Sequence, residues 1–308
     1  MDRKSVGVST AVIAGLFPGQ GSQTGDLRAL ARGVVPELLA ECDALVGEDP
    51  FARVGESTRF AQPAIYCASI AGWLQRPDIV QPVALAGHSL GELSALVAAG
   101  ALTQSSGLRL AVRRGALMAG ACDGQEQGML AVLGASEVQA AQLATDNDLV
   151  LANDNAPGQA VLAGPTKQLR AASNQARAER VRAIALDVAG AFHSPAMAGA
   201  VQPFRAELDQ VEFREPAVPV ICGSTARPFA DVRAELAQAI VRPVRWRETM
   251  LALAQLGAHT FVDFGPGQVL AKLVERNLPD ATVLDLASAA DTDGAGALGS
   301  RTEASNVA

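Results

Sequence analysis

The sequence predicts an α/β fold in which a large domain with a mainly parallel sheet carries a small inserted domain. Three observations point to it. Apolar runs alternate with helical patterns over the first 120 residues. The pentapeptide Gly87-His88-Ser89-Leu90-Gly91 joins one such run to a helix. Beyond about residue 123 the order of elements changes. A chain of 308 residues, 49% hydrophobic, is long enough for such a two-part architecture.

The first element is a predicted buried strand at residues 11–17, followed by a glycine-rich turn and by helical patterns up to about residue 76. The turn contains Gly19-Gln20-Gly21. It lacks the third glycine and the downstream acid of a dinucleotide fingerprint. The turn can instead offer a backbone amide or the Gln20 side-chain amide to an oxyanion.

The second strand, residues 82–86, runs into the pentapeptide, and residues 90–99 form the next predicted helix. Ser89 would therefore sit on a tight strand-to-helix turn that exposes its hydroxyl as a nucleophile, as in an α/β-hydrolase-like domain. The flanking glycines leave room for the turn, and the helix N-terminus stabilises developing negative charge. The alternative is an ordinary glycine-rich turn.

The helix predicted at residues 108–119 contains an arginine on its apolar stripe. Arg114 is aligned with Leu110, Leu117 and Met118 at helical spacing. A guanidinium on an inward face has to be paired. Two interpretations stay open: an internal bridge to a carboxylate, or a bidentate clamp for a substrate carboxylate.

The inserted unit is predicted by six consecutive elements in the order β-α-β-β-α-β, which fits a small ferredoxin-like domain. The strands are expected at 128–133, 150–153, 159–163 and 183–188, with helices from Ser136 and over 167–179. The α/β pattern then resumes with a helix beginning at Ser194-Pro195 and strands at 218–222 and 260–264. A cleft between the two parts is the natural place for a site.

The predicted boundaries follow from this order. The large domain takes residues 10–122 and 195–287, and the insertion takes 123–194. Residues 288–308 are rich in Gly, Ala, Ser, Thr and Asp and are expected to be a disordered tail.

A serine nucleophile needs a base, and the chain has only three histidines. His88 adjoins Ser89, so its side chain is expected to point elsewhere, and His259 is interpreted as a surface or structural residue. His193 follows a strand and precedes a capped helix, in a loop where the insertion rejoins the large domain. His193 is therefore the predicted general base, against the alternative of a structural histidine.

Charge and cysteine content limit the possible partners and compartment. The net charge of −7 argues against nucleic acid and anionic membranes. The four cysteines lie far apart and predict reduced thiols in a cytoplasmic protein, expected to be a monomer. No cluster has the spacing of metal ligands, so no metal or redox cofactor is expected.

Several separated motifs, in this order, resemble the malonyl-CoA:acyl carrier protein transacylase family, which includes the acyltransferase domains of polyketide synthases. The match extends from about Val12 to Asn277. The motifs are FPGQGSQ at 17–23, QPA at 62–64, GHSLGE at 87–92, RG at 114–115 with Met118, NAPGQ at 155–159, GAFHSP at 190–195, PVRW at 243–246 and FGPG at 264–267.

The resemblance implies a role for each matching residue. Ser89 would be the nucleophile and His193 the base. The Leu90 backbone amide and Gln20 would form the oxyanion hole, and Arg114 would hold the malonyl carboxylate. Gln62, Asn155 and Gln159 would line the pocket, and Phe192 looks like the malonyl-selecting variant. The backbone carbonyl that orients the histidine would be near Ala239, where relatives carry glutamine or asparagine, so the orienting partner stays open.

The implied reaction is ping-pong transfer of a malonyl group from the coenzyme A thioester to an acyl carrier protein. The first alternative is a serine hydrolase that releases acyl groups from thioesters, with Asp187 as a candidate acid. The second is a noncatalytic carrier-docking subunit. Because carrier proteins are usually acidic, a local arginine patch is also predicted, either Arg177, Arg180 and Arg182 or Arg242, Arg245 and Arg247.

Overall fold

The computed structural model describes residues 11–285 except 24–26 and 80. Its larger sheet has six strands in the order β10-β9-β1-β2-β7-β8, and all neighbours are parallel except β7 and β8. The strands are β1 (Ile13–Phe17), β2 (Ala84–Gly87), β7 (Val220–Cys222), β8 (Arg227–Pro228), β9 (Thr260–Asp263) and β10 (Thr282–Asp285). The mainly parallel sheet confirms the predicted fold class.

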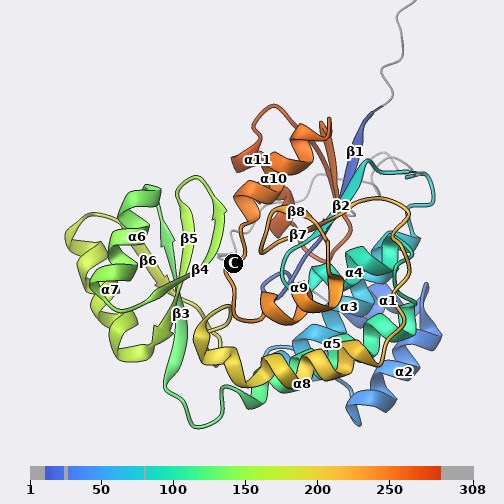
Figure 1. The fold of residues 1–308 in the computed structure, drawn as a ribbon, viewed down its shortest axis with the longest axis horizontal. Helices are drawn as coiled ribbons and strands as arrows, with labels where there is room; N and C mark the ends of the chain where they lie inside the picture. Colours follow the sequence, from blue (N-terminus) through green and yellow to red (C-terminus); the bar gives the residue numbers. More distant parts are fainter. Residues whose placement is uncertain (1–10, 24–26, 80, 286–308) are drawn as a thin grey trace, which may run out of the picture.

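Helices cover both faces of this sheet (Figure 1). One face packs under the helices α1 (Leu27–Arg32), α2 (Pro36–Val46), α3 (Thr58–Leu74), α4 (Gly91–Ala98), α5 (Gln104–Gly120), α8 (Ala198–Asp209) and α9 (Val232–Ala239), with a short 3₁₀ turn, Phe51–Arg53. The other face carries α10 (Trp246–Gln255) and α11 (Val269–Asn277). Side chains alternate between the faces: Leu16 packs with α10 and α11, whereas Phe17 packs with the opposite helices.

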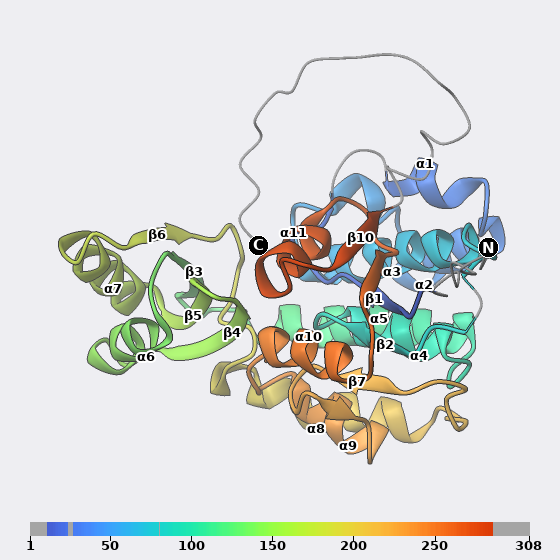
Figure 2. The same ribbon diagram turned by 90° about the horizontal axis from the view of Figure 1, so that it is seen from above.

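The inserted unit has its own antiparallel sheet in the order β4-β5-β3-β6. Its elements are β3 (Gln127–Leu133), α6 (Glu137–Asp146), β4 (Val150–Ala156), β5 (Gln159–Pro165), α7 (Thr166–Ala178) and β6 (Arg182–Ala185). Both helices pack on one face of this sheet, around Leu143 and Leu169. Figure 2 shows that α6 and α7 lie on the side of the small unit that is far from the large sheet. The first and third strands are central, as the ferredoxin-like prediction requires.

The two units meet along β4. Val244, which precedes α10, donates its N–H to the Ala152 carbonyl at 2.8 Å and accepts from the Asp154 N–H at 2.9 Å. Arg247 adds side-chain bonds to Asp154 and Glu137. The edge of the small sheet is therefore continued by a segment of the large unit.

Two element predictions need correction. The strand expected at 183–188 ends at Ala185, although Leu186 still donates its N–H to the Met129 carbonyl of β3 at 3.0 Å. Ser194 does cap a helical start with Pro195 in its first position, but that start is a 3₁₀ turn, Pro195–Met197, and α8 follows it. The expected tail of residues 288–308 lies outside the described residues.

Candidate active site

Ser89 occupies a left-handed turn between β2 and α4, with φ of 53°. That conformation is uncommon for a residue with a side chain. The glycines on either side have no space for a Cβ atom. At Gly87 it would lie 1.9 Å from the Gly91 carbonyl carbon, and at Gly91 it would lie 2.0 Å from the Phe17 carbonyl oxygen. Close backbone packing therefore fixes the turn that presents the Ser89 hydroxyl.

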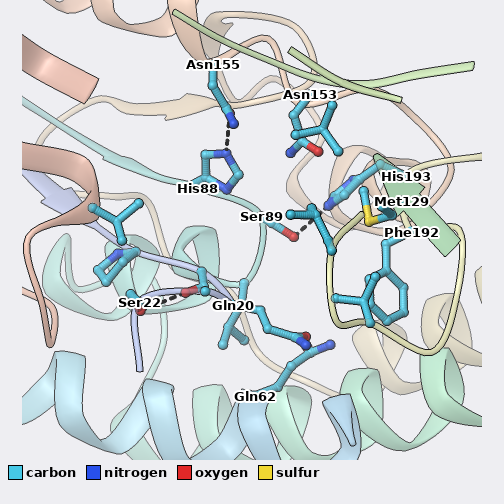
Figure 3. Close-up of a pocket in the computed structure, with 18 of the residues that line it drawn as sticks. Gln20, Ser22, Gln62, His88, Ser89, Met129, Asn153, Asn155, Phe192 and His193 are labelled. Atoms are coloured by element: carbon cyan, nitrogen blue, oxygen red, sulfur yellow. Dashed lines mark hydrogen bonds between the residues drawn. The ribbon is translucent and has the colours of Figure 1, made fainter. Parts of the chain in front are cut away.

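His193 meets Ser89 across this turn (Figure 3). Ser89 Oγ lies 2.8 Å from His193 Nε2. His193 Nδ1 faces two backbone carbonyls, Ala239 O at 2.9 Å and Arg242 O at 3.1 Å. Since carbonyls only accept, Nδ1 carries the proton, and Nε2 is left to accept from the serine hydroxyl. The carbonyl expected near Ala239 is in contact with the imidazole, and Arg242 supplies a second one.

The surroundings of His193 keep its ring neutral. The pKa of His193 is lowered to about 3, chiefly by burial and then by the nearby Arg114 charge and His88, although the hydrogen bonds to the two carbonyls raise it. A neutral imidazole is the form that can accept a proton. His193 also has a positive φ, 55°, in the loop where the insertion rejoins the large unit.

Arg114 lies on α5 and is 3% exposed. Its Nη2 donates to Ser89 Oγ at 3.1 Å and its Nη1 donates to the Gln62 side-chain oxygen at 2.9 Å. No salt bridge within the described part of the chain involves Arg114. Burial lowers its pKa to about 10, which still leaves it charged at neutral pH. The geometry therefore favours the clamp over the internal carboxylate bridge.

A cavity of about 250 Å³ opens beside these groups. Its lining includes the expected residues Gln20, Gln62, Ser89, Leu90, Arg114, Asn155, Phe192 and His193. Within the described residues, no hydrogen bond uses the backbone amide of Leu90, which is free to donate to an oxyanion. Gln159 is not part of the lining: it begins β5, opposite Leu133. The pocket role expected for Gln159 is not supported by this placement.

The remaining candidate residues lie apart from the reacting atoms. His88 turns away from Ser89, to Asn155 Oδ1 at 2.9 Å and to the Trp246 ring. His259 accepts from the Val12 N–H at 3.2 Å, which is a structural contact. Asp187 is exposed at the cavity wall, while backbone carbonyls occupy His193 Nδ1. A hydrolase acid at Asp187 is therefore not supported.

Two residues of the site were missed from the sequence. Glu92 is 2% exposed behind Ser89, and its Oε1 accepts from the Gly223 N–H at 2.7 Å. The sequence did contain a signal for it, because Glu92 is an acidic residue on a helix that is otherwise apolar. The Arg242 carbonyl carried no signal, because every residue has one.

Comparison with known proteins identifies the family of this chain. Residues 37–303 match the family model described as the acyl transferase domain. A malonyl CoA-acyl carrier protein transacylase of Synechocystis is 35% identical over 286 residues, which cover 89% of this chain and 96% of that protein. The polyketide biosynthesis protein ThaF of Burkholderia thailandensis is 39% identical over 86% of this chain, which spans only 24% of ThaF.

Solved structures show the same similarity. The crystal structure of malonyl-CoA:acyl carrier protein transacylase from Xanthomonas oryzae superimposes with a TM-score of 0.85 at 31% identity, covering 92% of this chain and 97% of that one. The fold, the serine turn and these matches define an acyltransferase. The chain belongs to the acyl transferase domain family.

Proposed function

We propose that this protein transfers a malonyl group from malonyl-CoA to the phosphopantetheine thiol of an acyl carrier protein. The observation that carries the proposal is the position of Ser89 Oγ, between the accepting His193 Nε2 and the donating Arg114 Nη2. One hydroxyl thus contacts both a base and a cation that has no ion pair in the described chain. The transacylase relatives from Synechocystis and Xanthomonas oryzae support the same reaction.

In the first half-reaction, His193 Nε2 takes the Ser89 proton as the oxygen attacks the thioester carbonyl. The tetrahedral oxyanion is stabilised by the Leu90 amide and by Gln20. The carbon–sulfur bond then breaks, His193 returns the proton to the coenzyme A sulfur, and a malonyl-Ser89 ester remains. In the second half-reaction, the carrier thiol gives its proton to His193 and attacks the ester, and Ser89 leaves with that proton.

Arg114 supplies selectivity for a free carboxylate in this scheme. The planar guanidinium can turn its donors from Ser89 to the malonyl carboxylate once the acyl group is attached. Gln62 supports it: the Gln62 side-chain nitrogen donates to Thr58 Oγ1 at 2.9 Å, while its oxygen accepts from Arg114. Phe192 lines the same cavity and would crowd a branched acyl group. The malonyl preference stays a prediction.

The decisive experiment is intact-mass detection of the acyl-enzyme. Wild-type protein mixed with malonyl-CoA should gain one malonyl adduct, and Ser89→Ala should gain none. Ser94→Ala is the matched control, because its buried hydroxyl on α4 has no partner within the described chain. A malonyl adduct that persists on Ser89→Ala would refute the nucleophile assignment.

The competing acyl-thioester hydrolase is distinguished by its product. A transferase forms malonyl-carrier protein faster than free malonate, whereas a hydrolase releases malonate whether or not the carrier is present. The expected cytoplasmic location and monomeric state also stay predictions. None of the described helices combines the length and the apolar composition that a membrane-spanning segment requires.

A further inference from the structure

Behind the Ser89–His193 pair lies a small group of residues that take no part in the proposed reaction steps. Glu92, Gly223 and the segment 242–244 surround a gap of about 10 Å³ together with Ser89 and His193. Glu92 is the carboxyl group of this cluster. Burying a carboxyl group costs free energy unless other groups stabilise it, because desolvation penalises its charged form.

The Glu92 carboxyl group accepts a hydrogen bond from the Gly223 N–H at 2.7 Å and also interacts with the Cys222 thiol. Gly223 in turn accepts the Arg245 N–H at its carbonyl, also at 2.7 Å. Arg245 lies only three residues after Arg242, whose carbonyl accepts from His193 Nδ1 at 3.1 Å. Two consecutive hydrogen bonds and three residues of backbone therefore connect the Glu92 carboxyl group to one of the two carbonyls that orient the base.

The same carboxyl group contributes to the electrostatics of the cavity. Arg114, which lacks a salt bridge in the described residues, is stabilised in its charged form by Glu92. The pKa of Glu92 is raised to about 7, chiefly by burial and slightly by Glu235, although the Gly223 N–H, the Arg114 charge and the Cys222 thiol act in the opposite direction. Near neutral pH both forms of Glu92 are populated, and in both forms an oxygen can accept from Gly223.

We propose that Glu92 is a positioning residue, which holds Gly223 and thereby keeps the Arg242 carbonyl where it shares with the Ala239 carbonyl the task of fixing the tautomer and orientation of His193. This inference rests on the proposed function for its kinetic consequence, but its geometric content is independent of the substrate. It requires an acceptor oxygen at the length of a glutamate side chain rather than a negative charge.

Two conservative variants separate these requirements. Glu92→Gln keeps the chain length and an acceptor oxygen and removes the charge, so kcat for malonyl transfer should stay within about fivefold of wild type. Glu92→Asp keeps the charge but cannot reach Gly223, so kcat should fall on the order of 100-fold, as for a small misplacement of a reacting group, with KM for malonyl-CoA changed less than threefold. Ser94→Ala on the same helix is the control.

The second measurement does not depend on activity. The chain has only three histidines, so ¹⁵N-histidine spectra can be assigned by single substitutions. His193 should show the Nδ1–H tautomer in wild type and in Glu92→Gln, and a mixture of tautomers in Glu92→Asp. A purely structural role would lower the melting temperature of Glu92→Asp and leave its tautomer unchanged.

Two results would overturn the proposal: an intact tautomer and wild-type kcat in Glu92→Asp, or equal losses in Glu92→Gln and Glu92→Asp. The spectra distinguish these failures from a failure of the proposed function. If Ser89→Ala still became acylated while Glu92→Asp lost the Nδ1–H signal, the reaction assignment would be wrong and the positioning role would stand.

Discussion

At the scale of single residues, the site combines groups whose ordinary properties are altered by burial. Arg114 stays charged but has no salt bridge in the described residues, and His193 stays neutral because burial opposes its protonation. Both shifts have the same cause, and each leaves its side chain in the form the proposed chemistry needs: a free cation for a carboxylate and a free nitrogen for a proton.

The clamp assignment predicts a change of selectivity. Arg114→Ala should lower kcat/KM for malonyl-CoA by about 100-fold, since losing charge-assisted hydrogen bonds costs about 3 kcal/mol. Acetyl-CoA, which has no free carboxylate, should lose far less, so the preference for malonyl collapses. The control is Arg113→Ala, an exposed neighbour that pairs with Glu207. Equal losses for both substrates would mean that Arg114 acts on Ser89 and does not select the acyl group.

The neutrality of His193 predicts an unusual pH profile. With its pKa lowered to about 3, the imidazole stays unprotonated as the pH falls from 8 to 5. A histidine of ordinary pKa, about 6.5, would lose roughly tenfold in activity by pH 5.5. We therefore expect kcat/KM to stay nearly flat on the acid side over this range. An acid limb centred near pH 6.5 would contradict the assigned environment.

The same shift affects folding stability with a definite sign. The unfolded chain binds the histidine proton near pH 6.5 and the folded chain only near pH 3. The contribution of neutral His193 is therefore complete above pH 6.5 and is lost as the pH falls toward 3. Circular dichroism at each pH has to accompany the kinetics, so that a loss of folded protein is not mistaken for protonation of the base.

At the scale of elements, the serine turn depends on glycines for a steric reason. Gly91→Ala would place a methyl group 2.0 Å from the Phe17 carbonyl oxygen, so the β1–β2–α4 junction would have to move. We expect a loss of at least about 1–3 kcal/mol in unfolding free energy and no acyl-enzyme by intact mass. Gly199→Ala is the control, because a Cβ there meets nothing within 4 Å. Normal acylation of Gly91→Ala would show that the turn tolerates a side chain.

Elements were predicted where their structure depends on residues that are neighbours in the sequence, and were missed where it depends on distant residues. The turn at Ser89 and the Ser136 cap, which forms a complete capping box with Gln139, are set by neighbours in sequence, and both were predicted. By contrast, β8, α9, α10, α11 and β10 were not predicted. The junction of Val244 with β4 consists of backbone bonds between residues about 90 positions apart. Any residue except proline can form both of these backbone hydrogen bonds, so the amino-acid sequence does not indicate where they occur.

At the scale of the whole molecule, the two units are joined where the cavity lies. Met129 and Val161 of the small sheet and Leu270 of α11 line the same cavity as Ser89. The position of the small unit therefore sets the shape of the pocket. Val244 links the units by backbone hydrogen bonds to β4. Arg247 on α10 adds a salt bridge to Asp154 at the same contact.

The contact between the two units predicts that Arg247→Ala causes a local loss of protection against amide hydrogen exchange. Arg247→Ala removes the cation from Asp154, whose carboxyl group is 18% exposed and whose pKa is already raised by burial. Leaving that acceptor unpaired should cost about 1–3 kcal/mol. Amide exchange of Asp154 and Val244 should accelerate, while Leu85 in the large sheet stays protected. Arg245→Ala, which breaks the pair with Glu248 and a hydrogen bond to the Thr225 carbonyl, is the control, and equal acceleration there would contradict the role of Arg247.

Charge distribution over the whole surface distinguishes the two arginine patches considered for the carrier. Of the second patch, Arg245 and Arg247 are held in salt bridges, while Arg242 is exposed and has none within the described residues. All the lysines and arginines between 123 and 194, in contrast, are exposed and without a salt bridge in the described residues: Lys167, Arg170, Arg177, Arg180 and Arg182. From Arg182, β6 leads to Leu186 at the cavity wall, about 13 Å away at the rise of an extended strand.

This distribution predicts that an acidic carrier protein docks on α7 and β6. Arg177→Glu combined with Arg182→Glu should raise KM for the carrier about tenfold at low salt, through loss of electrostatic steering, and the effect should shrink as salt is added. Acylation of Ser89 by malonyl-CoA, which needs no carrier, should be unchanged. Arg245→Glu is the comparison from the salt-bridged patch. If Arg245→Glu raised the carrier KM and the α7–β6 variant did not, the carrier would dock on the segment that joins the two units.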